Sequence, residues 1–333
     1  MLHKIILPAH LPRKQYQIIT NAANSQKIEV DPIVIEVEGY EHRFPILDYK
    51  RKQVPKTGDL FLKALRLMKT RGDWDNLVRL TSGLRRAHRH ISPDMVLGIV
   101  RHAGKTGNMY AVIDAFRNSK RSQLYIRTLP IADNVLHYLQ TMALDSGYAE
   151  RPTRDAKTWA VMLHELAQDP AHAKKADKVA GSRKRTPLHR EPQVVGQVLH
   201  LAAAQAVHHQ GARDEDGKVA KLAETLALLW PEGRQLKDLN TPYEIPQKAT
   251  LRIAFMQTSD AHLALSVSRR ISIASFILHG IGLAKQVVEP GLAARLEPIE
   301  KVLSEELAEL AAKRGEIKAG DGWAVYDKLI AKA

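Results

Sequence analysis

The chain has 333 residues and no cysteine, and its 50 lysines and arginines against 36 acidic residues give a formal net charge of +14. The lack of cysteine excludes disulfides, thiolate metal sites and cysteine nucleophiles, and a hydrophobic content of 44% excludes wholesale disorder. No apolar run approaches the roughly 20 residues of a membrane helix, so the composition predicts a basic soluble protein with a polyanionic partner, most commonly nucleic acid.

Residues 1–57 are expected to form an extended basic arm followed by a small β-hairpin. Four cations and no acid precede Glu29: Lys4, Arg13, Lys14 and Lys27. This composition suits an organellar transit peptide and also a retained arm that threads into a ribonucleoprotein. We favour the retained arm, and cleavage stays open. The β-branched run at 33–37, the Gly39–Tyr40 turn and the segment 42–47 predict the hairpin.

From residue 58 almost to the end, apolar residues recur at helical spacing and predict a mainly α body. We divide it into a helical-repeat domain at 58–170, a basic loop at 171–192 and a C-terminal helical region at 193–333. The expected helices span 60–68, 77–84, 94–102, 109–116, 130–144, 153–168, 192–209, 218–229, 247–256, 261–283, 292–313 and 323–330. Four residues are expected to cap helix N-termini: Asp59, Asp73, Ser92 and Thr153. The 292–313 helix is expected to expose one charged face, made of Lys301, Glu305, Glu306, Glu309 and Lys313.

Two segments of the helical-repeat domain are similar at an offset of 35 residues. Lys69–Val78 aligns with Gly104–Ile113, so that Gly72 aligns with Gly107, and a large apolar residue, a cap and a hydrophobic pair also match. Each segment predicts a helix, a glycine turn in the left-handed conformation and an antiparallel helix. The sequence therefore predicts helical hairpins that repeat along the chain.

This period, the Gly-(Asp/Asn) turn and the Ser-Pro-Asp start at residues 92–94 resemble the pentatricopeptide-repeat proteins, which are α-solenoids that bind RNA. The resemblance covers about residues 58–145. It implies a helical-hairpin fold, rRNA or tRNA as partner, and a mitochondrial location in the matrix. Arrays of this kind with basic extensions are similar to fungal-type accessory proteins of the mitochondrial ribosome, which implies neighbouring ribosomal proteins as further partners. No base-reading residues are carried over, because the register rests on two repeats.

The net positive charge is concentrated in two segments. Residues 58–127 carry a net charge of +9 and residues 171–192 a net charge of +5, which together equal the whole excess. Concentrated cations gain affinity for phosphates through counterion release. The expected RNA-binding residues are Arg85, Arg86, Arg89, Arg117, Lys120, Arg121, Arg127, Lys174, Lys175, Arg183, Lys184, Arg185 and Arg190. If the two hairpins stack, the cations at 85–89 should adjoin those at 117–121 on one edge.

Other interpretations of these cations stay open. Arginines in the last turn of a helix also interact favourably with the helix dipole, and a solvated basic face needs no partner. The run Arg183–Arg185 also fits a nuclear-localisation signal.

The sequence offers no catalytic constellation, and we expect neither an enzyme nor a cofactor or metal site. The segment Gly98–Thr106 has one residue too many between its glycines for a phosphate-binding loop. His164 and His172 lack the spacing of a zinc protease, and the histidines of the 192–209 helix lack an acidic third ligand. The predicted function is that of a non-catalytic structural component of the mitochondrial ribosome, or a factor bound to it, that contacts RNA phosphates. The alternatives are a protein-binding scaffold that docks through 292–313 and an organellar mRNA-binding expression factor.

Overall fold

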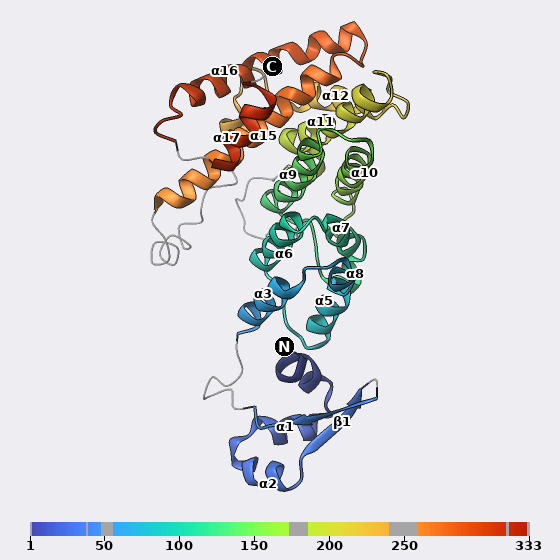
Figure 1. The fold of residues 1–333 in the computed structure, drawn as a ribbon, viewed down its shortest axis with the longest axis vertical. Coiled ribbons are helices and arrows are strands. Elements are labelled where there is room, and N and C mark those ends of the chain that lie inside the picture. The colour runs from blue at the N-terminus through green and yellow to red at the C-terminus, as the bar shows by residue number, and fades with distance from the viewer. Residues whose placement is uncertain are drawn as a thin grey trace. The chain divides into compact units, whose positions relative to one another are not determined.

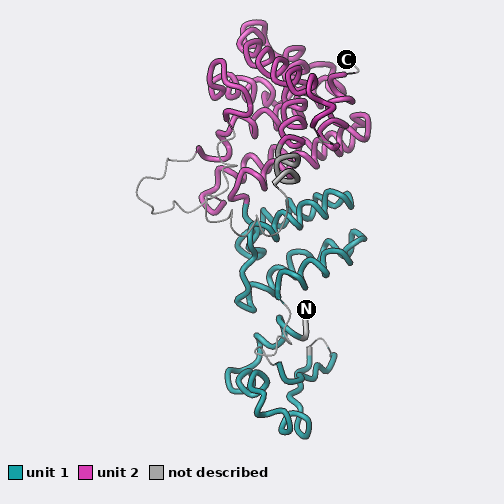
Figure 2. Tube along the Cα trace, turned by 90° about the vertical axis from the view of Figure 1, so that its left-hand side faces the viewer, with its two compact units in different colours: residues 1–125 teal, residues 126–333 magenta. Residues whose placement is uncertain are grey.

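The computed structural model describes residues 2–37, 39–47, 56–172, 186–239, 259–317 and 320–331. The chain forms two compact units, residues 1–125 and 126–333 (Figure 2). This division runs through the predicted helical-repeat domain at 58–170, and the four-segment organisation stays a prediction. The expected helix at 247–256 lies outside the described residues.

Residues 2–37 and 39–47 form the N-terminal part of the first unit, which we call the N-terminal body. Its elements are η1 (Leu2–Ile6), η2 (Leu7–His10), α1 (Arg13–Thr20), η3 (Ala22–Asn24), α2 (Ser25–Val30), β1 (Ile33–Val37) and β2 (Tyr40–Phe44). The predicted hairpin is confirmed, with Ile33 opposite Phe44 and Val37 opposite Tyr40. The extended arm is wrong: this segment is helical, because its apolar side chains are buried in one core. The buried residues of that core are Leu7, Leu11, Ile19, Ile28, Phe44 and Leu47.

The rest of the first unit consists of helices that pair into hairpins. They are α3 (Thr57–Leu67), α4 (Arg71–Asp75), α5 (Leu77–Arg86), α6 (Pro93–Lys105), α7 (Met109–Arg117) and α8 (Ser119–Ser122). Helix α3 packs on α6, and α5 packs on α7 and α8, so the hairpins stack (Figure 1). The Tyr110 hydroxyl donates a hydrogen bond to Asp75 Oδ1 at 2.8 Å and lies 2.9 Å from the Arg71 carbonyl oxygen. Asp75 and Tyr110 are 35 residues apart, so equivalent positions of the two repeats touch.

The hairpin turns agree with the sequence at one repeat and differ at the other. Gly107 has a φ of 70°, the left-handed conformation that was predicted. Gly72 does not end a helix: it lies in the first turn of α4, where Thr70 and Asp73 form a reciprocal capping box. Asp73 is therefore the third residue of α4 and not its cap, because the Thr70 hydroxyl fills that place.

Of the other three predicted caps, one is confirmed and two are wrong. Ser92 caps α6 by accepting a hydrogen bond from the Met95 backbone N–H at 3.3 Å. Asp59 and Thr153 lie inside their helices, which begin earlier than the apolar pattern indicated.

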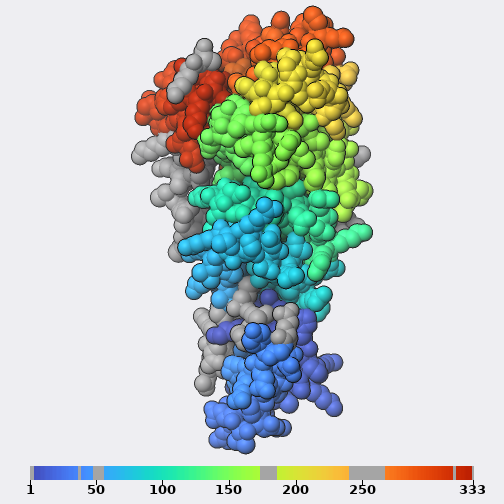
Figure 3. Space-filling model, turned by 45° about the vertical axis from the view of Figure 1, so that its right-hand side comes forward, coloured from blue at the N-terminus to red at the C-terminus, as the bar shows by residue number. Residues whose placement is uncertain are grey.

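The second unit is built around α11 (Pro192–His209). Its other elements are α9 (Leu129–Asp145), α10 (Glu150–Leu166), η4 (Leu188–Arg190), α12 (Lys218–Leu229), α13 (Leu236–Leu239), α15 (Ser259–Ala284), α16 (Pro290–Ala312) and α17 (Gly320–Leu329). Helix α11 packs on α9, α10, α12 and α15 and is buried on almost every side. Helix α12 (yellow) lies against α16 (orange) in Figure 3.

No helix of the described residues is long and apolar enough to cross a bilayer. The mainly α fold with one small antiparallel sheet is thus confirmed.

A glycine lets the central helices of the second unit approach each other. A Cβ atom on Gly280 of α15 would lie 2.6 Å from Cα and 2.7 Å from Cβ of His200 on α11. Real Cβ atoms do not come that close to a backbone atom, so only glycine fits at this crossing. Gly282, two residues further along the same helix, has no such neighbour within 4 Å.

We therefore expect opposite results from two alanine substitutions in α15. Gly280→Ala should lower the free energy of unfolding by about 1–3 kcal/mol, because the helices must separate to admit the methyl group. Gly282→Ala should leave it unchanged or raise it by up to about 1 kcal/mol, because alanine favours the helix and meets nothing. Urea unfolding of both variants measures the difference, and equal stabilities would show that α11 and α15 do not cross at Gly280.

Next to this crossing lies a cluster of histidines around one tyrosine. The Tyr148 hydroxyl lies 3.1 Å from His200 Nε2 and 3.5 Å from His279 Nδ1, and its ring stacks on His208 at 4.8 Å between centroids. The Gln140 amide nitrogen lies 3.2 Å from His200 Nδ1. Burial lowers the pKa of His279 to about 4 and holds the pKa of His200 well below its usual value, and neighbouring histidines add charge repulsion. These side chains are therefore neutral in the folded protein.

The neutral histidines make the stability of the protein depend on pH. Below pH 6.5 the unfolded chain binds protons that the folded cluster does not, so the free energy of unfolding should fall as the pH drops towards about 4. Each such histidine contributes a slope of about 1.4 kcal/mol per pH unit. Glu191 opposes the trend between 4.5 and about 7, because burial raises its pKa to about 7.

Thermal melting between pH 5 and pH 8 measures this dependence. His279→Gln should make the acid-side slope shallower, because one of the neutral histidines is lost. A melting temperature of the parent that stays constant over this range would contradict the neutral cluster.

Candidate nucleic-acid interface

The structure brings two of the predicted cation groups together at one hollow. The hollow measures about 510 Å³ and is lined by Ser82, Arg85 and Arg86 from α5 and by Lys120 and Arg121 from α8. All four cations are exposed to solvent, and none of them takes part in an ion pair within the described residues. Arg85 and Arg86 thus lie close to Lys120 and Arg121, and we call this place the basic hollow.

The end of α5 positions two of these arginines. The helix closes with a paired turn in which the His88 N–H donates to the Arg85 carbonyl at 2.9 Å and the Arg89 N–H donates to the Leu84 carbonyl at 2.9 Å. His88 takes the left-handed conformation at a φ of 53°, where glycine is more usual. Arg85 and Arg86 therefore stand in the last helical turn, where the helix dipole favours cations.

A short helix on a buried floor positions the other two cations. Ser122 is fully buried, and its hydroxyl donates to the Ala115 carbonyl at 2.6 Å and accepts from the Leu124 N–H at 3.1 Å. Gln123 then ends α8 in the left-handed conformation at a φ of 60°. Because α8 is fixed to the end of α7 in this way, Lys120 and Arg121 project from a packed surface.

The remaining predicted RNA-binding residues do not line the hollow. Arg89 is half-buried beyond the turn at the end of α5, and Arg117 is exposed at the end of α7. Arg127 and Arg190 belong to the second unit, where both are exposed. The other predicted residues lie outside the described part of the chain: Lys174, Lys175, Arg183, Lys184 and Arg185. An RNA contact by any of the predicted residues stays a prediction.

Sequence reasoning missed Ser82 as a member of the site. The signal is present in the sequence, because Ser82 precedes Arg85 and Arg86 by three and four residues and so shares their face of α5. Arg79 is exposed on the same helix, seven residues before Arg86, and extends the cationic face along α5.

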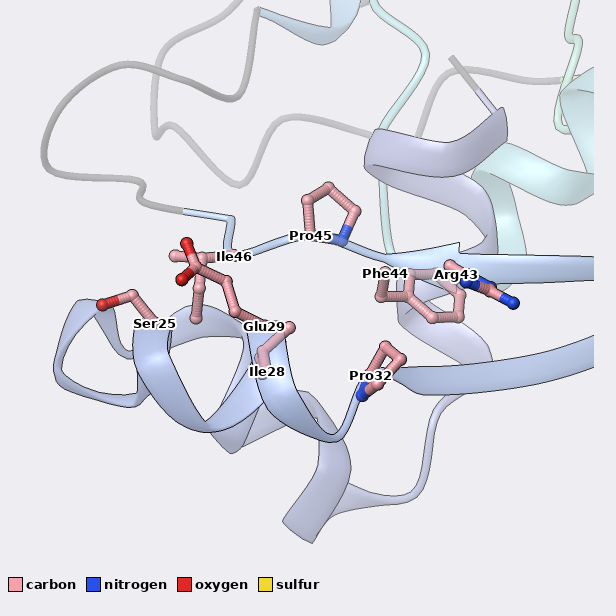
Figure 4. Close-up of a pocket in the computed structure, with 8 residues that line it drawn as sticks. All are labelled: Ser25, Ile28, Glu29, Pro32, Arg43, Phe44, Pro45 and Ile46. Atoms are coloured by element: carbon pink, nitrogen blue, oxygen red, sulfur yellow. The ribbon is translucent and has the colours of Figure 1, made fainter.

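A second hollow, of about 490 Å³, lies in the N-terminal body (Figure 4). Apolar residues from α2 and from the end of β2 make up most of its lining, and the charged groups are one acid, Glu29, and one base, Arg43. Its charges are balanced, so it lacks the concentrated positive charge of the basic hollow.

The segment that resembles a phosphate-binding loop has another structure. Gly98 and Lys105 both lie within α6, so no loop is present there to cradle a phosphate. Within the described residues, no group of three side chains is placed to hold a metal ion.

The fold and the charge place the chain in the class of basic, mainly α-helical proteins. The chain matches the model of a family described as mitochondrial ribosomal protein mS27 over residues 1–328. The small ribosomal subunit protein mS27 of Neurospora crassa is 29% identical over 308 residues, covering 88% of this chain and 78% of that protein. The chain therefore belongs to the mitochondrial ribosomal protein mS27 family. The predicted mitochondrial ribosomal setting is confirmed, and the pentatricopeptide resemblance stays a prediction.

Replacement of Arg85, Arg86 and Arg89 with glutamine should leave the melting temperature within about 2 °C of that of the parent protein. Exposed charges contribute little to stability, and two small effects oppose each other. Loss of cations weakens their interaction with the dipole of α5, whereas repulsion from Lys120 and Arg121 is relieved. Circular dichroism and thermal melting check this result, and a large fall would show that these arginines hold the end of α5 in place.

Proposed function

We propose that the chain is a non-catalytic structural component of the small subunit of the mitochondrial ribosome, in the matrix, and that the basic hollow contacts rRNA phosphates. The observation that supports the RNA contact is the concentration of Arg85, Arg86, Lys120 and Arg121 at one place without acidic partners within the described residues. The nearest carboxylate along α7, Asp114, is engaged by the Asn118 amide at 3.1 Å. The cations are therefore available to phosphate oxygens, which arginine can bind through two parallel hydrogen bonds.

The membership of the family supports ribosomal RNA and ribosomal proteins as partners. It gives no support to tRNA, so we propose rRNA alone. The scaffold alternative docks the protein through 292–313, but the apolar stripe of α16 is buried against α12 and α15 and is not open to a partner. The buried side chains of the stripe are Leu296, Ile299, Leu303, Leu307 and Leu310. Nothing observed favours the scaffold over the RNA contact.

A salt titration of the ribosomal complex tests the proposal. The hollow variant, R85Q/R86Q/K120Q/R121Q, and a control variant with the same loss of charge are expressed in mitochondria of the source organism. The control is K63Q/R66Q/R101Q/K105Q, whose four cations are exposed on α3 and α6 of the same unit.

Sucrose gradients at increasing salt should show that the hollow variant leaves the small subunit at lower salt than the parent protein and the control variant. Each lost contact should weaken association by about 1 kcal/mol. Equal salt resistance of the two variants would contradict an RNA contact at the hollow. Sedimentation of the parent protein at the top of the gradient at low salt would contradict the ribosomal role and favour the mRNA-binding alternative.

A further inference from the structure

We infer that the basic hollow binds the sugar–phosphate backbone of double-stranded RNA, without reading its sequence and in preference to single strands. This inference rests on the proposed RNA contact and adds the structural class of the RNA. It follows from three features of the described residues: what lines the hollow, where the aromatic rings of the unit lie, and how firmly the cations are held.

The lining of the hollow suits the phosphates of a nucleic-acid backbone. It consists of four cations and one hydroxyl, from Ser82. Recognition of base edges by side chains mostly uses amides, carboxylates or arginine forks within a groove or around splayed bases. Among the residues that the structure describes, no amide, carboxylate or ring lines the hollow, so its lining offers charge and hydrogen-bond donors to a backbone.

No aromatic ring of the described residues lines the hollow, and four rings of the stacked hairpins are buried or held in place. Proteins that bind single strands hold successive bases against aromatic side chains. Here Phe61, Trp74 and Phe116 are buried in the core. Tyr110 is held by the hydrogen bond from its hydroxyl to Asp75, and Arg71 lies over its ring at 4.8 Å. A single strand would therefore gain charge attraction at the hollow but no stacking.

The cations stand on packed helices and not on a loop. Beneath them, Leu84, Ala115 and Ser122 are fully buried, and α8 is tied down through the two hydrogen bonds of Ser122. A fixed set of cations matches a partner whose phosphates are also fixed. An A-form duplex is rigid and is recognised through its backbone and shape, whereas a flexible strand must lose conformational freedom to fit the same set.

Fluorescence anisotropy with the full-length protein tests the inference. The probes are a labelled RNA duplex of about 16 base pairs, its uridine-rich strand alone, and a DNA duplex of the same sequence. Each probe is titrated against the parent protein, the hollow variant and the control variant over a range of salt concentrations. If melting shows that the hollow variant has lost its fold, the pair K120Q/R121Q on α8 takes its place.

The parent protein should bind the RNA duplex at least about tenfold more tightly than the strand, because the duplex presents more phosphates in a fixed array. The hollow variant should lose at least about tenfold in duplex affinity, and its salt slope should fall by up to about 0.9 per contact removed. The control variant should keep most of the duplex affinity. Weaker binding of the DNA duplex would further support recognition of the A-form backbone.

The failures of the two proposals are distinguishable. One result would overturn this inference and leave the proposed RNA contact standing. In it, the parent protein binds the single strand at least as tightly as the duplex, and the hollow variant loses this binding. Equal loss of duplex binding in the hollow and control variants would overturn both. Equal affinity for the RNA and DNA duplexes would also overturn the preference for RNA and reduce the hollow to a general polyanion site.

Discussion

The packing of α5 on α7 and α8 determines where the charge of the first unit gathers. Burial of Leu84 and Phe116 stacks the hairpins and carries Arg85 and Arg86 next to Lys120 and Arg121. Four cations at this short separation repel one another, so the arrangement alone is unfavourable. Water and salt weaken this repulsion. The apolar core offsets this cost, and the fold gains only the weak interaction of the exposed cations with the helix dipole. Because the fold does not require these four cations, they are the residues that we expect to contact a partner.

The second unit depends on a different constraint, the close crossing of α11 and α15 at Gly280. Polar side chains line this interior, and several of them hydrogen-bond to one another. Asp133 is fully buried and accepts hydrogen bonds from the Gln193 and Gln197 amides at 2.7 and 3.0 Å. Gln140 reaches His200 in the same core. Buried polar groups are costly when unpaired, so these pairs restrict which helix faces can meet and in which register.

Patterns that are local in the sequence predicted their structures well. The β-branched run at 33–37 and the glycine that follows it at position 39 predicted the hairpin, and the 3.6-residue apolar period predicted most helices. The offset of 35 residues between Gly72 and Gly107 also gave the stacked hairpins. The cations at 85–86 and 120–121 could be placed on one edge because stacked repeats bring equivalent ends together.

Features that depend on distant residues could not be predicted. Glu306 was expected to be exposed, yet it is buried, where it accepts a hydrogen bond from the Leu236 N–H at 2.7 Å and lies 3.5 Å from Arg270 Nε. Nothing in the sequence of α16 indicates a partner 70 residues away. The N-terminal segment was predicted to be extended for a related reason. The prediction followed its basic composition, whereas its structure depends on isoleucines and leucines that pack with the distant Phe44 in one core. The role of Gly72 was misjudged because the neighbouring Thr70 supplies a stronger cap.

The period of the repeat and the basic charge belong together for a physical reason. The C-terminal end of a helix carries a partial negative charge, so cations are favoured in its last turn. In a stack of antiparallel hairpins, the second helices of all repeats run in the same direction, so their C-terminal ends share one edge. Every added hairpin therefore adds one more favourable place for cations beside the last. A repeat of this kind concentrates positive charge along an edge while its core stays apolar, and it needs no loop, metal or catalytic group to present that charge to phosphates.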